Sequence, residues 1–154
     1  MPGDTRPVRV PPRWFAHAAW RVHRAVYTVT GGRIGLWRPG QTKWGAFRLT
    51  VVGRRSGKAR SVILAYFEDG PNVVTLAMNG WGEGHPAWWL NLQAHPEAEA
   101  TIAGATRAVR GRAAEPGPEH DRLWARWQTF DRDLDAYVTQ RRTDTPVVIL
   151  EPRR

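Results

Sequence analysis

Short apolar runs separated by turn residues are the main pattern between residues 48 and 152. These runs are rich in β-branched and aromatic residues, and Gly, Pro, Asn and Asp bound them, as is typical of β-strands. Short turns such as Glu68–Asn72 and the one around Gly104 would join neighbouring strands into antiparallel pairs. The predicted strands are Arg48–Val52, Val62–Phe67, Val73–Ala77, Ala98–Ile102, Thr106–Ala113 and Pro146–Pro152.

Three helices are predicted between these strands. Pro86 is suited to the first position of a helix that runs to about Ala94, before His95–Pro96. Two further helices are expected at Pro118–Phe130 and Asp133–Gln140. Because the helices interrupt the strands instead of alternating with them, the pattern favours a mainly β, α+β fold: an antiparallel barrel with peripheral helices.

The N-terminal region has a different pattern. Apolar residues recur at three- and four-residue steps from Pro12 to about Thr30, with arginines largely on the other face, and Gly31–Gly32 ends this predicted basic amphipathic helix. The helix could pack on the domain, lie on an anionic membrane, or cover an apolar ligand tunnel. We therefore divide the chain into residues 1–38, a basic tail and helix, and residues 39–154, a barrel domain, with a linker over Gly31–Gly45.

Composition excludes several classes of function. The 154-residue chain has no cysteine, which rules out disulfides and thiol chemistry, and its five histidines show no metal-ligand spacing with carboxylates. No signal peptide or membrane-spanning run is visible, so a cytoplasmic protein is expected, with the inner face of the cell membrane as a further option.

The net charge of +9 is unevenly distributed. Residues 1–38 contain seven Arg and one Asp, a net of +6, and the remaining 16 cations and 13 acids leave +3. A nucleic-acid-binding protein usually spreads its cations over one face or groove, so this distribution argues against nucleic acid and favours a surface-binding arm.

The segment "VVGRRSGKARS", residues 51–61, contains four cations and two glycines between apolar runs. It is not a nucleoside-triphosphate loop, because Gly53 and Gly57 enclose only three residues, Ala59 follows Lys58, and a strand follows where a helix is needed. What remains is a strand–loop–strand turn with a cationic rim. From these residues alone it is either a solvated basic hairpin or an anion site.

The segment "AMNGWGEGHPAWWLN", residues 77–91, leads from a glycine-rich loop into the first helix. Trp88 and Trp89 are adjacent on that helix and cannot face the same way, whereas Asn91 shares the face of Trp88. Taken alone, this arrangement favours core packing over a ligand site.

Together the segments "LTVVGRRSGKARSVILAYFEDG", "AMNGWGEGHPAWWLNLQAHPEA" and "DAYVTQRRTDTPVVILEP" carry a family resemblance. In this order and spacing, which extends from Leu49 to Pro152, the chain resembles the deazaflavin-dependent nitroreductase family, a branch of the flavin-binding split β-barrels of actinobacteria. The resemblance implies an FMN-binding split-barrel-like fold that binds coenzyme F-420, with FMN as the less favoured cofactor.

The resemblance also implies a set of site residues. The phosphate and the anionic tail of the deazaflavin would be bound by Arg54, Arg55, Ser56, Gly57, Lys58 and Arg60. The ring would lie along Ala77, Met78, Asn79 and Gly80, with Trp88 and Asn91 bracing it, and Tyr66 and Tyr137 would lie at the substrate pocket as candidate catalytic residues. The implied reaction is hydride transfer from the reduced cofactor to a hydrophobic acceptor such as a quinone, a nitroaromatic or an unsaturated lipid.

Three positions depart from the family pattern, and the first is Ile63, where many members have a Pro before the Leu of the second strand. Met78 replaces a small Ser beside the reactive ring, and Leu134 replaces a tyrosine three residues before Tyr137. The loss of two hydroxyls favours an apolar acceptor over a nitro compound.

Two other functions stay open at this point. The chain could be a split-barrel protein that binds a deazaflavin, FMN or a fatty acid without turnover, or a module that binds nucleic acid or membranes. A homodimer is also left open.

Overall fold

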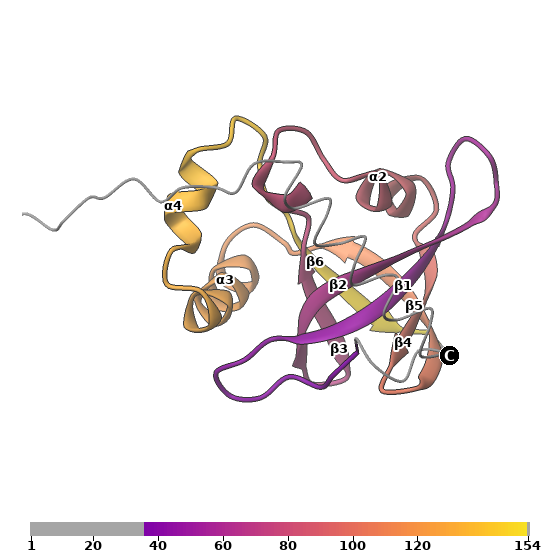
Figure 1. Ribbon diagram of the computed structural model, residues 1–154, viewed down its shortest axis with the longest axis horizontal. Coiled ribbons are helices and arrows are strands. Elements are labelled where there is room, and N and C mark those ends of the chain that lie inside the picture. Colours follow the sequence, from indigo (N-terminus) through magenta and orange to yellow (C-terminus); the bar gives the residue numbers. More distant parts are fainter. Residues whose placement is uncertain (1–35, 154) are drawn as a thin grey trace, which may run out of the picture.

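The computed structural model describes residues 36–153 (Figure 1). The basic tail, the predicted helix over residues 12–30 and the first part of the predicted linker lie outside the described residues. Within residues 36–153, no helix is long and apolar enough to cross a membrane.

Six antiparallel strands form a closed barrel, as the sequence predicts. Around the barrel the order is β1-β2-β3-β6-β5-β4, so all neighbouring strands except the pairs β1/β4 and β3/β6 are consecutive in the chain. The strands are β1 (Gly45–Val52), β2 (Ala59–Asp69), β3 (Asn72–Leu76), β4 (Glu97–Ile102), β5 (Ala105–Ala113) and β6 (Val147–Pro152).

Strands β1 and β2 are longer than their apolar runs. Their ladder extends to the pairs Val51 with Arg60 and Val52 with Ala59, next to the basic loop. At the other end of β1, Trp37 and Ala46 exchange backbone hydrogen bonds of 3.3 and 2.9 Å, so residues 37–46 fold back as a turn. Backbone pairing therefore continues where the apolar pattern stops.

The barrel interior is one hydrophobic core, and helix α2 (Ala87–Ala94) covers one end of it. Trp88, Trp89 and Leu92 of α2 are buried against interior side chains of the strands. Gly111 of β5 makes room for this helix, because a Cβ atom there would collide with the Leu92 side chain.

Helices α3 (Pro118–Phe130) and α4 (Leu134–Thr139) cover part of the outer barrel face (Figure 1). Leu123 and Trp127 of α3 and Leu134 of α4 pack on Phe67, Val74 and Ile149, which point outward from their strands. The two faces of the same strands therefore serve two separate cores, one inside the barrel and one beneath the helices.

Candidate functional site

The basic segment forms a tight turn between β1 and β2. The Gly53 N–H donates to the Lys58 carbonyl at 2.8 Å, and the Gly57 N–H donates to the Gly53 carbonyl at 2.8 Å. Gly57 has a φ of 68°, and a Cβ atom at Gly53 would lie 2.8 Å from Ser56 Oγ. The two glycines are thus required by the turn itself, and the predicted strand–loop–strand arrangement is confirmed.

Asn91 anchors this turn to α2. Its buried Oδ1 accepts hydrogen bonds from the Arg54 backbone N–H at 3.1 Å and from Arg54 Nη1 at 2.8 Å. The sequence places Asn91 among the residues that brace the cofactor, and the structure joins it to the predicted phosphate loop across 37 positions of sequence.

Three cations of the turn remain available to a ligand. The side chains of Arg55, Lys58 and Arg60 are exposed and make no ion pair with any described residue. Ser56 Oγ accepts the Lys58 N–H at 3.2 Å, which keeps its hydroxyl proton free to donate. Guanidinium, ammonium and hydroxyl donors on a rigid turn are the groups that a phosphodiester requires, so this donor set fits an anionic cofactor tail.

An apolar cavity of about 380 Å³ lies between the outer face of β2 and helices α3 and α4. Asp131 is the only charged side chain among the described residues that line it. This volume and lining are typical of a site for a flat hydrophobic ligand. The lining residues are Trp37, Trp44, Ala46, Ile63, Leu64, Ala65, Leu76, Met78, Trp81, Trp127, Phe130, Asp131 and Leu134.

Strand β2 connects the cationic turn with this cavity. Arg60 lies at its start, and Ile63, Leu64 and Ala65 line the cavity three to five residues later. An extended strand rises ~3.3 Å per residue, so the two features are separated by roughly 10–17 Å along β2. The cationic turn and the cavity therefore lie at two points along the same strand.

Segment 77–80, predicted to run along the deazaflavin ring, lies next to the cavity. Ala77 is buried and its N–H donates to the Pro146 carbonyl at 3.0 Å, whereas Met78 lines the cavity. Asn79 Nδ2 donates to the carbonyls of Glu83 at 2.9 Å and Gly84 at 3.1 Å, so its amide holds the loop.

Trp81 is a lining residue that the sequence reasoning missed. Its indole stacks on the Tyr137 ring, with centroids 5.3 Å apart and an interplanar angle of 19°. The glycine-rich surroundings predicted a loop, and nothing in the local pattern indicated on which side the Trp would lie.

The two candidate catalytic tyrosines occupy different places, and neither lines the apolar cavity. Tyr137 supports Trp81 from behind the cavity wall; partial burial is the main cause that raises its pKa, followed by the nearby Asp131 and Asp133. Tyr66 is fully buried inside the barrel against Phe47, where desolvation raises its pKa. The Tyr66 hydroxyl has no hydrogen-bond partner among the described residues.

Trp88 and Trp89 are both buried and meet edge to face with centroids 6.2 Å apart. Trp88 contributes to the core at the barrel end, and Trp89 borders a second, more open cavity of about 590 Å³.

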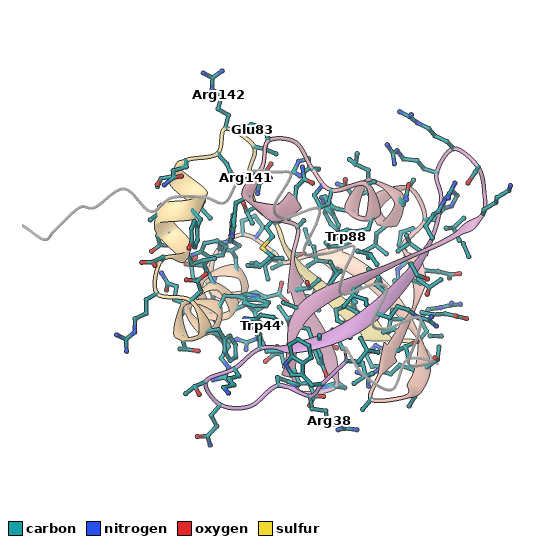
Figure 2. The ribbon with its side chains drawn as sticks, in the orientation of Figure 1. Arg38, Trp44, Glu83, Trp88, Arg141 and Arg142 are labelled. Atoms are coloured by element: carbon teal, nitrogen blue, oxygen red, sulfur yellow. The ribbon has the colours of Figure 1, made fainter. Side chains whose placement is uncertain are left out.

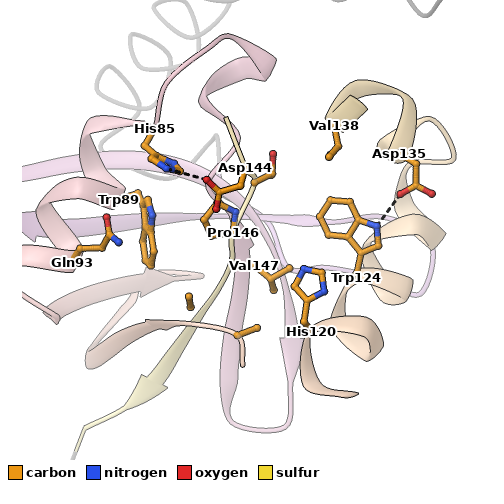
Figure 3. Close-up of a pocket in the computed structure, with 13 residues that line it drawn as sticks. His85, Trp89, Gln93, His120, Trp124, Asp135, Val138, Asp144, Pro146 and Val147 are labelled. Atoms are coloured by element: carbon orange, nitrogen blue, oxygen red, sulfur yellow. Dashed lines mark hydrogen bonds and ion pairs between the residues drawn. The ribbon is translucent and has the colours of Figure 1, made fainter. Parts of the chain in front are cut away.

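That second cavity lies between α2 and the pair α3–α4 (Figure 3). His85 Nε2 lies 3.3 Å from Asp144 Oδ1, and the Trp124 indole N–H donates to Asp135 Oδ1 at 2.9 Å. Within residues 36–153 no group of three metal-ligating side chains occurs, here or elsewhere, and the His85 Nδ1 atom is buried without a hydrogen-bond partner.

Comparison with known proteins identifies the family. The sequence profile of the F420H(2)-dependent quinone reductases matches residues 19–152. The chain belongs to this family. The resemblance to deazaflavin-dependent reductases, the oxidoreductase class and the F420 cofactor are thereby confirmed.

Individual relatives agree with the family assignment. An F420H(2)-dependent quinone reductase of Mycobacterium tuberculosis (strain ATCC 25618 / H37Rv) is 29% identical over 132 residues, which cover 84% of this chain and 86% of that protein. The counterpart in Mycobacterium tuberculosis (strain CDC 1551 / Oshkosh) has the same identity and coverage.

Solved structures support the fold. An F420-H2 dependent reductase superposes with a TM-score of 0.61 at 26% identity, covering 69% of this chain and 93% of that one. A structure described as a domain-swapped dimer has a TM-score of 0.65 at 24% identity, covering 89% and 98%. The predicted split barrel is therefore confirmed for this family member.

Proposed function

We propose that this quinone reductase family member binds F420 along β2, with the cofactor tail at the cationic turn and the ring in the apolar cavity. The observation that carries the proposal is the position of an unpaired cationic turn and an apolar cavity on one strand. The bound cofactor supplies the hydride, and an acceptor of the quinone class receives it in the same cavity.

In this proposal the residues of the chain bind, orient and exclude water. Arg55, Lys58, Arg60 and Ser56 bind the phosphodiester and the first carboxylates of the tail, whereas Asn91 acts indirectly by holding Arg54 and the turn. Trp88 acts through the packing of α2 on the barrel. The cavity keeps ring and acceptor together in a water-poor space, which favours direct transfer between them.

The chemistry of the cavity selects the acceptor. Met78 and Leu134 contribute methyl groups to its wall at the positions where hydroxyls were expected. A flat quinone gains from burial against such a wall, whereas a nitro group would lose hydrogen bonds to water without replacement. We therefore favour a quinone over a nitroaromatic acceptor.

Titration of the purified full chain with oxidised F420 and with FMN tests the cofactor site. We expect saturable F420 binding at micromolar concentrations, much weaker FMN binding, and faster oxidation of reduced F420 by menadione than by a nitroaromatic. Absence of F420 binding would reject the proposal. Binding without turnover on either acceptor would favour the alternative of a non-catalytic carrier.

We further propose that residues 12–30 contact an anionic membrane and bring the cavity to an acceptor dissolved in it. The net charge of +6 in residues 1–38 supports this contact. Trp37 and Trp44, which are 43% and 40% exposed, lie at the cavity and are typical of side chains at a membrane interface. Liposome binding tests this contact.

A homodimer is a separate assembly proposal. One structural neighbour is described as a domain-swapped dimer, although its likeness to this chain concerns the fold alone. Sedimentation equilibrium distinguishes one chain from two, and a mass that stays at one chain over a wide concentration range would reject the dimer.

A further inference from the structure

The loop after β3 contains three consecutive residues in the left-handed backbone region. Asn79, Gly80 and Trp81 have φ values of 50°, 59° and 63°. Glycine adopts this conformation freely and asparagine tolerates it, but a bulky tryptophan rarely does. Such a conformation persists only where the surrounding structure imposes it.

Local hydrogen bonds close the turn, but they join its own residues and do not connect it to the barrel. The Trp81 N–H donates to the Met78 carbonyl at 2.9 Å, and the Gly82 N–H donates to the Asn79 carbonyl at 3.1 Å. Contacts from a distant segment are needed to hold the turn against the barrel.

Arg141 provides these contacts from the end of α4. Its side chain is buried, with 8% of the residue exposed, and all three of its nitrogens donate hydrogen bonds. Nε donates to the Gly82 carbonyl at 3.0 Å, Nη2 to the Gly84 carbonyl at 3.0 Å, and Nη1 to Thr145 Oγ1 at 2.6 Å. The guanidinium therefore joins the loop, 57–59 positions earlier, to the start of β6.

Glu83 of the loop forms a second set of hydrogen bonds with the segment that follows Arg141. Its carboxylate accepts the backbone N–H groups of Arg142 at 2.9 Å and Thr143 at 3.2 Å, and the Thr143 hydroxyl at 3.0 Å. Figure 2 shows Arg141 directed inward beside Glu83, whereas the Arg142 side chain points away from the molecule.

The connected loop decides where Trp81 lies. One side of its indole lines the apolar cavity, and the Tyr137 ring, four residues before Arg141, stacks on it. Release of the loop would let the backbone leave the left-handed region and withdraw the indole from the cavity wall.

We infer that Arg141 is a positioning residue that holds the left-handed turn 79–81 so that Trp81 forms a flat wall of the apolar cavity and selects planar acceptors. The selection of acceptors rests on the proposed function; the positioning of Trp81 does not. Arg141 touches neither ring nor acceptor in this proposal and acts only through the loop.

Amide hydrogen exchange of the cofactor-free full chain tests the positioning. In Arg141→Met we expect the amides of residues 79–84 to exchange at least tenfold faster than in the native chain, with β2 unchanged. Arg141→Lys keeps the charge but cannot make the three guanidinium hydrogen bonds in the same geometry, so the exchange rate of these amides should be intermediate. Arg142→Ala removes the same charge one position away and should leave the rate unchanged.

A second variant guards against an indirect effect of the buried substitution. Glu83→Gln changes an exposed residue on the other side of the connection and should also raise exchange in residues 79–84. Unchanged exchange of this loop in both Arg141→Met and Glu83→Gln would overturn the inference, as would an equal increase in the Arg142→Ala control.

Acceptor kinetics test the second half of the inference. With saturating F420, Arg141→Met should raise the KM for menadione at least fivefold while kcat changes less than twofold. An equal rise of KM in the Arg142→Ala control, or a fall in kcat at constant KM in Arg141→Met, would overturn the role in acceptor selection. If the native chain binds no F420, the proposed function fails while the exchange experiment still decides the positioning of the loop.

Discussion

At the scale of single residues, Arg55 and Arg60 are proposed to bind the anionic tail of the cofactor. Both side chains are exposed on a turn whose backbone is fixed by its own hydrogen bonds and by Asn91. A rigid frame matters here because the binding energy of an anion is then not spent on ordering the loop.

Replacement of each arginine by alanine should weaken F420 binding. A hydrogen bond to a charged group contributes about 1.5–3 kcal/mol, so Arg55→Ala or Arg60→Ala should raise the dissociation constant roughly ten- to a hundredfold. Fluorescence titration of F420 measures this change. Arg110→Ala, which removes an exposed arginine of β5, is the matched control, and an unchanged constant in both turn variants would place the phosphate elsewhere.

Single residues also mark the limit of sequence reasoning. The type and position of the loop cations were readable, because their chemistry is local. The partner of Asn91 was not, since the Arg54 contact spans 37 positions and depends on how α2 sits on the barrel. The orientation of Trp81 was likewise undetermined, because its left-handed backbone is imposed by distant contacts.

At the scale of elements, two arginine–carboxylate pairs fasten α3 to the barrel. Arg122 donates to both oxygens of Asp69 at 2.7 and 2.9 Å, at the end of β2. Arg112 of β5 donates to both oxygens of Glu119 at 2.9 and 2.7 Å and also to Glu151 at 2.6 Å. Since α3 forms one wall of the apolar cavity, these pairs help to define its width.

The Arg112 pair predicts a pH dependence of stability. Hydrogen bonds from Arg112, and from the Glu115 N–H, lower the pKa of Glu119 from 4.5 to about 2. Because the folded pKa is depressed, the pair stabilises the fold fully above pH 4.5 and loses this effect as the pH falls toward 2.

We expect Glu119→Gln to lower the free energy of unfolding at pH 7 by about 1 kcal/mol, since partly exposed pairs are screened by solvent. The difference from the native chain should shrink as the pH falls below 4.5. Urea denaturation at several pH values measures it. Glu99→Gln, an exposed carboxylate of β4, serves as control, and a difference that is constant with pH would argue against the ion pair.

Element types followed from the sequence, but some boundaries did not. Helix α3 begins and ends where its pattern predicted, because apolar periodicity and Pro118 mark both limits. Strands β1 and β2 each begin three residues before the predicted start. Backbone pairing needs no apolar side chain once a ladder has formed.

At the scale of the whole molecule, the proposed membrane contact is supported by the net charge of residues 1–38 and by the exposed aromatic residues at the cavity. The described part contributes Trp37 and Trp44, whose rings lie 5.3 Å apart beside the cavity. Attraction of clustered arginines to anionic lipid is electrostatic and decays within a Debye length, so salt should weaken it.

The full chain should therefore bind anionic liposomes at low salt and dissociate as salt rises. A variant with Arg13, Arg21 and Arg24 changed to Gln should bind several-fold more weakly in a sedimentation assay. Changes at Arg107 and Arg110, two exposed arginines of β5, should have much less effect for each charge removed. Binding that is independent of salt, or equal loss in the barrel variant, would count against the contact.

The sequence by itself determined the strands, the helices and the cationic turn, because each depends on residues that are close in the chain. Through the resemblance of three separate segments it also determined the cofactor. The tertiary structure decided which residues form the cavity, since its walls come from the turn before β1, strands β1, β2 and β3, the loop after β3, and helices α3 and α4. It also decided that Tyr66 points into the barrel core and that Arg141 reaches the loop around Trp81. These outcomes depend on barrel closure and helix docking, which set the distances between side chains that local patterns cannot encode.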